Sequence, residues 1–325
     1  MNLSDITTIT LNPAIDQTVF VRDLQVGQVN RASESHLQTG GKGVNVATML
    51  SLSGTVAAVT GFLGLANVDI FESHFRKHRL HDHFIRVQGA TRTGIKIVDT
   101  QADENTDVNL PGPIIDQAHQ DRLLDRLRKI ALSGRWFVLA GSLPPGVEPE
   151  YVREIIKALR CAGSRIAVDT SGEALRVALD EGVDLAKPNR DELAEYLNAD
   201  LSNYREAMDA AQELQRSKIP NLVVSMGGEG ALFLTPNARL MASAPHAKVV
   251  STVGAGDSLL AGFLKGLMAN ASPADCARLA TVFAWNRLES LTPHLPSHDE
   301  LEDQMRLISV QPLTAFESKA AQVFN

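Results

Sequence analysis

The second half of the sequence alternates short apolar runs, rich in β-branched residues, with amphipathic segments of helical length. The runs are nearly continuous in apolar character, as strands buried on both faces are, and the alternation is typical of a parallel sheet covered by helices. The strands predicted in this way are Trp136–Ala140, Arg165–Asp169, Val183–Ala186 and Leu222–Ser225. The sequence therefore indicates an α/β fold with a central, mostly parallel sheet flanked by helices.

A polar or glycine-rich turn follows each of these predicted strands. The turns read GSLPPG after Ala140, DTSG from Asp169, KPNRDE from Lys187 and SMGGEG from Ser225. Ligands of open α/β sheets bind outside the carboxyl ends of the strands, so we expect a ligand site where these turns meet. Helices are predicted to begin at Glu148–Glu150, at Asn189 and at Ser202.

Two segments, Val19–Leu37 and Thr91–Asn109, show β-branched residues and polar alternation without helical periodicity. We interpret them as antiparallel strands that lie beside the main sheet and pair into one small covering sheet. The sequence has no repeats and no long linkers. We therefore predict a single domain over residues 1–325, with the additional strands inserted at about 16–37 and 91–110.

The composition argues against several classes of protein. A net charge of −7 without a dense Lys/Arg tract does not favour a nucleic-acid partner. Cys161 and Cys276 are isolated, which indicates neither a zinc site nor a disulfide framework and fits a reducing cytoplasm. Met1–Pro13 has no signal-peptide pattern, and the longest apolar stretch, Val249–Ala269, is interrupted by charges. We expect a soluble, cytoplasmic protein with no membrane partner.

The motif with the clearest chemistry is VVSTVGAGDS at Val249–Ser258, in which a strand-like run passes through small residues into an apolar helix near Asp257. Gly254, Ala255 and Gly256 leave the helix start uncovered, so that its free N–H groups and its dipole can face an anion such as a phosphoryl group. Asp257 could then accept a proton from an attacking hydroxyl. The alternative is a tight turn with Asp257 as an ordinary N-cap. The motif is not a Walker loop.

A second glycine cluster, GGKGVNVA, lies at Gly40–Ala47. Its glycines allow a ligand to approach the backbone closely, and Lys42 and Asn45 could bond hydroxyl or phosphate groups. Asn45 falls in the first turn of a helix predicted to run to about Gly54. A surface turn with a solvated lysine explains the cluster equally well.

Two further motifs point to a nucleotide. Asn189 and Glu192 are three residues apart at a helix start and could hold hydrated Mg²⁺ near phosphates, although a capping box explains the same pair. The glycines after Ser225 could admit a nucleotide close to the backbone, or could simply form a β-turn.

Taken in this order, the four motifs resemble the PfkB family of carbohydrate kinases, and the resemblance covers nearly the whole chain. Thr8–Ala14 with Asp16, Gly27–Arg31 and Val87–Lys96 are similar to the subgroup that acts on phosphosugars. The resemblance implies a ribokinase-like fold with a small β-sheet lid over the sugar, and a homodimer formed through that lid. It also implies a kinase that uses ATP and Mg²⁺.

The substrate that the resemblance favours is a ketose phosphate, with fructose 1-phosphate converted to fructose 1,6-bisphosphate. Tagatose 6-phosphate and fructose 6-phosphate are the alternative acceptors within the family. A sugar-phosphate sensor without catalytic activity is the alternative from another class of protein.

Roles for single residues follow from the same resemblance. Asp257 would be the general base, with the amides of Gly254, Ala255 and Gly256 as the anion hole. The sugar would be held by Asp16, Gly40, Gly41, Lys42 and Asn45, and its phosphate by Arg92, Lys96 and Arg31. The nucleotide would be lined by Asn189, Ser225, Gly227, Gly230, Thr252, Gly254 and Gly256, with Glu192 as the metal ligand.

The chain departs from the family at 281–288. The family usually carries small and aliphatic residues there, against the adenine pocket. This sequence instead has Phe283, Trp285, Asn286 and Arg287, so we expect a reshaped pocket or a rotated helix.

Overall fold

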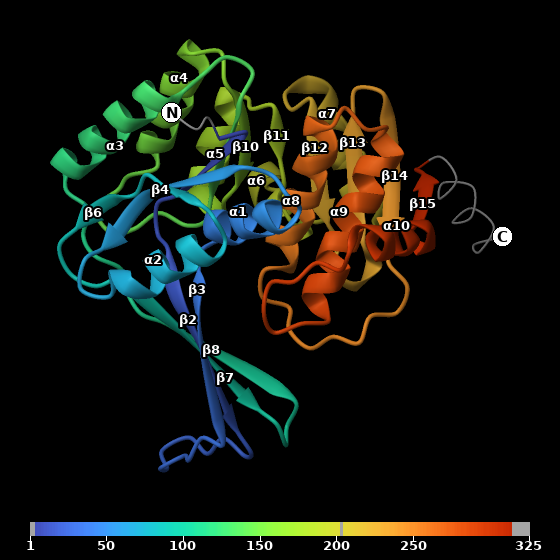
Figure 1. Ribbon diagram of the computed structural model, residues 1–325. Helices are drawn as coiled ribbons and strands as arrows, with labels where there is room; N and C mark the ends of the chain where they lie inside the picture. The colour runs from blue at the N-terminus through green and yellow to red at the C-terminus, as the bar shows by residue number, and fades with distance from the viewer. Residues whose placement is uncertain (1–3, 202–203, 314–325) are drawn as a thin grey trace.

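The structure is a computed structural model that describes residues 4–201 and 204–313. Its body is an eleven-stranded sheet in the order β15-β14-β13-β12-β11-β10-β9-β1-β4-β5, with β6 paired to β4 (Figure 1). The strands are β1 (Ile6–Thr10), β4 (Ala57–Gly64), β5 (His81–Asp82), β6 (Ile85–Val87), β9 (Trp136–Ala140), β10 (Arg165–Asp169), β11 (Leu185–Ala186), β12 (Asn221–Ser225), β13 (Ala231–Thr235), β14 (Ala238–Ser243) and β15 (Ser309–Pro312). Pairing is parallel from β5 to β12 and antiparallel from β12 to β15.

Helices cover both faces of this sheet. They are α1 (Lys42–Leu52), α2 (Val68–Lys77), α3 (Gln117–Ile130), α4 (Glu150–Cys161), α5 (Gly172–Glu181), α6 (Arg190–Leu197), α7 (Tyr204–Ser217), α8 (Ala255–Met268), α9 (Pro273–Leu288) and α10 (His298–Leu307). Side chains alternate across a strand, so β9 serves two cores. Phe137 and Leu139 belong to the core under α3 to α7, while Trp136 and Val138 belong to the core under α1, α2, α8, α9 and α10.

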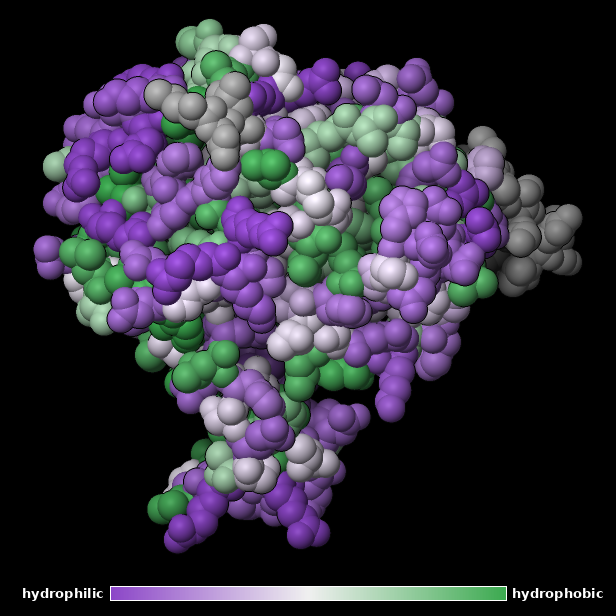
Figure 2. Space-filling model, viewed as in Figure 1, coloured by the Kyte–Doolittle hydropathy of each residue, from purple (hydrophilic) through white to green (hydrophobic). Residues whose placement is uncertain are grey.

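A separate four-stranded sheet projects from the body (Figures 1 and 2). Its order is β3-β2-β7-β8, with β2 (Ala14–Val21), β3 (Glu34–Gly40), β7 (Arg92–Asp99) and β8 (Glu104–Asn109). The predicted class, a mostly parallel α/β sheet with an additional small sheet, is therefore confirmed.

The prediction that all strands of the small sheet are antiparallel is wrong for the central pair. The β2–β3 and β7–β8 hairpins are antiparallel, but β2 and β7 pair in parallel. The reason is that both strands leave the body in the same direction, β2 directly after β1 and β7 after β6. Most of the predicted strand from Val19 is an exposed loop over residues 22–33, and the strands lie on either side of it.

Several predicted boundaries changed in the body. β11 is shorter than predicted, because the Asp184 side chain accepts the amide of Ile166 at 2.8 Å where a strand would continue the ladder. Val249 and Val250 lie in a loop rather than a strand and are 57% and 46% exposed. The helix start predicted at Ser202 lies outside the described residues.

The other predicted helix starts are close to those observed, because α4 begins at Glu150 and α6 follows its N-cap Asn189. None of the helices in the described parts of the chain is both long and apolar enough to cross a membrane.

Candidate active site

The turns after the parallel strands meet the starts of α1 and α8 at one edge of the sheet. Two cavities adjoin there, a polar cavity of about 460 Å³ and a larger, more apolar cavity of about 750 Å³. Asn189, Ser225 and Gly256 line both. The start of α8 therefore forms part of the boundary between the two cavities.

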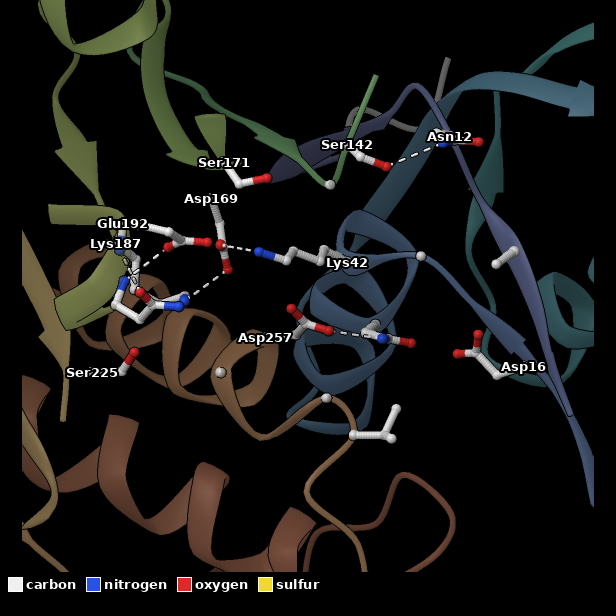
Figure 3. A pocket seen from close by; sticks show the side chains of 18 of the residues that line it. Asn12, Asp16, Lys42, Ser142, Asp169, Ser171, Lys187, Glu192, Ser225 and Asp257 are labelled. Atoms are coloured by element: carbon white, nitrogen blue, oxygen red, sulfur yellow. Dashed lines mark hydrogen bonds and ion pairs between the residues drawn. The ribbon is translucent and has the colours of Figure 1, made fainter. Parts of the chain in front are cut away.

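Asp257 lies in the first turn of α8, facing the polar cavity (Figure 3). The N-cap of α8 is Gly254, in a left-handed conformation with φ of 78°, and the Asp257 carboxylate does not cap the helix. Instead, its Oδ2 accepts a hydrogen bond from Asn45 Nδ2 at 2.7 Å. The N-cap alternative is therefore wrong, and a bond from α1 sets the orientation of the carboxylate.

The Asp257 side chain is poised to exchange a proton near neutral pH. Burial, assisted by the negative charge of Asp169, raises the pKa of Asp257 to about 6. The amides of Gly256 and Asp257 have no backbone acceptor among the described residues, as expected in the first turn of a helix. A proton acceptor and an anion-binding helix terminus thus lie side by side.

Asp169 organises the cations of the polar cavity. It is the last residue of β10, is fully buried, and forms ion pairs with Lys42 Nζ at 2.8 Å and Lys187 Nζ at 2.9 Å. Burial alone would raise its pKa, but the charges of the two lysines more than offset this and hold the pKa below its usual range. In the same way, Asp169 outweighs the effect of burial and raises the pKa of Lys42. The Lys42 ammonium therefore remains charged, and the two ion pairs fix both lysine side chains in place.

The small sheet supplies the other side of the polar cavity. Asp16 on β2 and Arg92 on β7 both line it, and Arg92 Nη1 donates to Asn109 Oδ1 at 3.3 Å. Burial raises the pKa of Asp16, an effect partly offset by the charge of Arg92. Figure 3 shows Asp257 between Asp169 on one side and Asp16 on the other.

Two predicted glycines of the sugar site have steric roles. A Cβ at Gly40 would lie 2.1 Å from Asp16 Oδ2, so Gly40 makes room for that carboxylate and does not itself line the cavity. Gly41 lines the cavity with φ of 106°, and a Cβ there would lie 2.9 Å from the Thr10 side chain.

Two of the predicted phosphate ligands lie outside the polar cavity. Lys96 is four residues beyond Arg92 on β7, about 13 Å along the strand, and pairs with Asp107 at 3.1 Å. Arg31 lies in the exposed loop that joins β2 to β3. Within one chain, neither residue joins Arg92 at the cavity.

The predicted nucleotide residues divide between the two cavities. Gly227, Gly230 and Thr252 line only the apolar cavity, and Gly254 lines only the polar cavity. Ala255, predicted as part of the anion hole, also lines only the apolar cavity, and its amide donates to the carbonyl oxygen of Thr252 at 3.3 Å. The residues between Ser225 and Ala231 connect the antiparallel strands β12 and β13, and they include a 3₁₀ turn at Gly227–Glu229.

Glu192 and Asn189 form the capping box that the sequence allowed. Asn189 Oδ1 accepts from the Glu192 amide at 2.7 Å, and Glu192 Oε2 accepts from the Asn189 amide at 2.9 Å. Glu192 also lines the polar cavity, and no cluster of three or more potential metal ligands occurs among the described residues. One carboxylate of this kind suits Mg²⁺, which keeps several waters and binds mainly through phosphates.

The four unusual residues of α9 point in different directions. Trp285 alone among them lines the apolar cavity. Phe283 is fully buried in the core, and Asn286 donates to Gln304 at 2.7 Å. Arg287 is buried beside Gly254. Of these four side chains, only that of Trp285 therefore contributes to the shape of the apolar cavity.

Some of the cavity residues were not singled out from the sequence as site residues. They are Asn12, Gly141, Ser142, Asp169, Ser171 and Lys187. Most of them lie in the turns GSLPPG, DTSG and KPNRDE, and their position at strand ends was the signal that could have identified them.

Comparisons with known proteins give a consistent result. Residues 9–291 match the model of the pfkB family carbohydrate kinases. The chain is 40% identical to a 1-phosphofructokinase of Rhodobacter capsulatus over 309 residues, covering 95% of this chain and 98% of that protein. It is 42% identical to a 1-phosphofructokinase of Xanthomonas campestris, covering 87% and 91%. The solved structure of Escherichia coli phosphofructokinase-2 with substrates and products superposes with a TM-score of 0.87 at 29% identity, covering 93% and 98%.

Proposed function

The chain belongs to the pfkB family of carbohydrate kinases, and on this basis we propose that it transfers the terminal phosphoryl group of ATP to the 6-hydroxyl of fructose 1-phosphate. The identity of 40–42% to relatives named 1-phosphofructokinase, over most of each chain, supports this acceptor. The products are fructose 1,6-bisphosphate and ADP.

The observation that carries the proposal is the position of Asp257, next to the free amides of α8 and at the boundary of a polar and an apolar cavity. A sugar phosphate is polar and anionic, whereas a nucleotide base presents a large apolar face. We assign the sugar phosphate to the polar cavity and the base to the apolar cavity. The transferring phosphoryl group then lies at the helix terminus that both cavities share.

Residues at the start of α8 account for the proton transfer and for the charge that develops in the transfer step. The 6-oxygen of the sugar attacks the terminal phosphorus of ATP, and its proton passes to the Asp257 carboxylate. The bond between that phosphorus and the bridging oxygen of ADP breaks. The amides of Gly256 and Asp257, with the ammonium of Lys187 near Gly256, stabilise the charge on the phosphoryl oxygens.

The acceptor is held from both sheets. Asp16 and Asn45 bind sugar hydroxyls, while Arg92 binds the phosphate already present on the sugar. Lys42 lines the same cavity and compensates the combined negative charge of the two substrates. This division leaves Asp257 facing the free end of the sugar.

Glu192, with Asn189 beside it, is the group that fits Mg²⁺ on the nucleotide side. Bound there together with the phosphates of ATP, Mg²⁺ would neutralise charge on the phosphate oxygens. The capping box fixes the position of Glu192 whether or not a metal is bound.

A coupled assay of ADP release, comparing fructose 1-phosphate, fructose 6-phosphate and tagatose 6-phosphate, tests the acceptor. We expect fructose 1-phosphate to give the highest kcat/KM. A higher value with either of the other sugars would overturn the acceptor assignment. Tight sugar-phosphate binding with no ADP formation would instead indicate the non-catalytic sensor.

Self-association through the small sheet is part of the proposal. The outer strands β3 and β8 leave open edges, and Val26 and Val29 on the adjoining loop are 96% and 87% exposed. Open strand edges and exposed apolar side chains favour pairing with a second copy. A monomeric mass in light scattering at micromolar concentration would contradict this.

A further inference from the structure

The end of α9 supports the loop that leads into the start of α8. The carbonyl oxygen of Leu288 accepts hydrogen bonds from the amides of Val250 at 2.7 Å and Ser251 at 3.1 Å. Glu289 Oε1 accepts from the amide of Lys248 at 3.1 Å. The phosphoryl-binding loop is therefore held in place by the last turn of α9 and not by a neighbouring strand.

Arg287 extends from this same turn to the back of the loop. Its side chain is 4% exposed, and a Cβ placed on Gly254 would lie 3.2 Å from Arg287 Nε and 3.6 Å from Asn45 Nδ2. Asn45 is the residue that orients Asp257. The guanidinium thus packs against Gly254, the N-cap of α8, and Asn45 lies near the same glycine.

This cation is buried without a contacting carboxylate. Its Nη1 donates to the carbonyl oxygen of Ser290, and no carboxylate among the described residues lies within 4 Å of it. Burial lowers the pKa of Arg287, and the more distant charges of Asp257 and Asp16 only partly offset this. Burying a charge without an ion-pair partner costs free energy. The burial of the Arg287 guanidinium is therefore best explained if a bound anion lies close enough to offset that cost.

We propose that Arg287 is a positioning residue that fixes the α8 N-terminal loop and supplies a permanent positive charge behind the transferring phosphoryl group. The inference rests on the proposed phosphoryl transfer, which brings that anion to the opposite side of the loop. Arg287 does not touch the substrate. It acts through the backbone of Gly254 and through its charge.

Lys187 and Lys42 also favour the ionisation of Asp257, but they differ from Arg287 in having an ion-pair partner. Lys42 and Lys187 share Asp169, which cancels part of their combined charge at the site. The negative charge of Asp169 opposes the ionisation of Asp257. Arg287 packs against Gly254 and makes no ion pair with a described residue.

Two substitutions separate charge from shape. Arg287→Lys keeps the positive charge but loses the planar fork, and Arg287→Gln keeps part of the polar contact but loses the charge. Asn286→Ala is the matched control, because Asn286 is the preceding residue of the same helix, is also buried, and bonds to Gln304 away from the site.

For Arg287→Gln we expect kcat to fall by about 10–100-fold, as for supporting residues in other sites, with a small change in KM for ATP. The acid limb of the pH profile of kcat/KM should move to higher pH, because Asp257 loses a nearby cation. Arg287→Lys should keep the acid limb of the natural protein and recover much of kcat. The control should lower Tm while leaving kcat and the pH profile unchanged.

Two results would overturn the role of Arg287. One is a Gln variant whose acid limb and kcat match those of the natural protein. The other is a Lys variant that loses as much activity as the Gln variant, with neither acid limb displaced, which would leave Arg287 as a packing residue. Failure of the proposed function would look different, since the unsubstituted protein would then form no ADP.

Discussion

The substitution Asp257→Asn tests the proposed chemistry most directly. It keeps the size of the side chain. It also keeps an oxygen that can accept the hydrogen bond from Asn45 Nδ2, which is 2.7 Å long in the unsubstituted protein. It removes only the ability to take a proton. Because the side chain of Asp257 does not cap α8, the helix should form normally in the variant.

The expected loss of kcat is large because no other carboxylate of the polar cavity is positioned to replace Asp257 as the base. Asp169 is fixed between Lys42 and Lys187, and Glu192 is part of a capping box. Asp16 lies on the small sheet, beyond Asp257 as seen in Figure 3. None of them is free to replace the base, so the full contribution of a positioned base, about 10²–10⁴-fold in kcat, should be lost.

The thermal stability of the Asp257→Asn variant should be maintained or increased, although its activity falls. The pKa of Asp257 is higher in the folded state than in the unfolded state, so ionisation of Asp257 destabilises the fold. The stability that the protonated carboxyl contributes is fully present below pH 3.8 and is lost as the pH rises through about 6. At pH 7 the neutral asparagine avoids this cost, and Tm should be equal to or above that of the natural protein.

The measurements are ADP release, calorimetric binding of ATP and fructose 1-phosphate, and thermal unfolding. A variant with intact binding and near-normal kcat would refute the assignment of Asp257 as the base.

Four other tests have definite expected outcomes. The kcat/KM of the natural protein should fall as pH drops through about 6, because Asp257 must be ionised to accept a proton; a flat profile down to pH 5 would contradict this. Arg92→Ala should raise KM for the sugar phosphate by about 10–100-fold through the loss of a charge-assisted contact, without lowering Tm. Lys42→Ala should raise the same KM but also lower Tm in thermal unfolding, because Asp169 is left buried with one lysine. Gly40→Ala should raise KM for the sugar phosphate and leave KM for ATP unchanged, since its Cβ would displace Asp16; equal effects on both constants would argue against a local cause.

The parts of the fold that the sequence predicted well are those governed by burial alone. β9 and β10 match their predicted bounds because strands covered on both faces give continuous apolar runs. The small sheet was located, but not its pairing, because the parallel contact between β2 and β7 depends on where both strands leave the body. Periodicity within a segment carries no information on that geometry.

The site residues that were missed have the same explanation. Asp169 and Lys187 are single polar residues at strand ends, and nothing local distinguishes a residue that forms a buried ion pair from one that terminates a strand. The directions taken by Phe283, Trp285 and Arg287 could not be predicted either, because much of α9 is buried on more than one side. A helix of this kind shows no polar face from which its orientation could be inferred.

The separation of the polar cavity into two structural halves has an evolutionary consequence. Asp16 and Arg92 belong to the projecting sheet, whereas Asp257, Asn45 and the free amides belong to the body. Substitutions on β2 and β7 can therefore change which sugar is accepted without disturbing the groups that break and form bonds. A lineage with this architecture can acquire new acceptors by drift in one small sheet, while the catalytic groups of the body stay under unchanged selection.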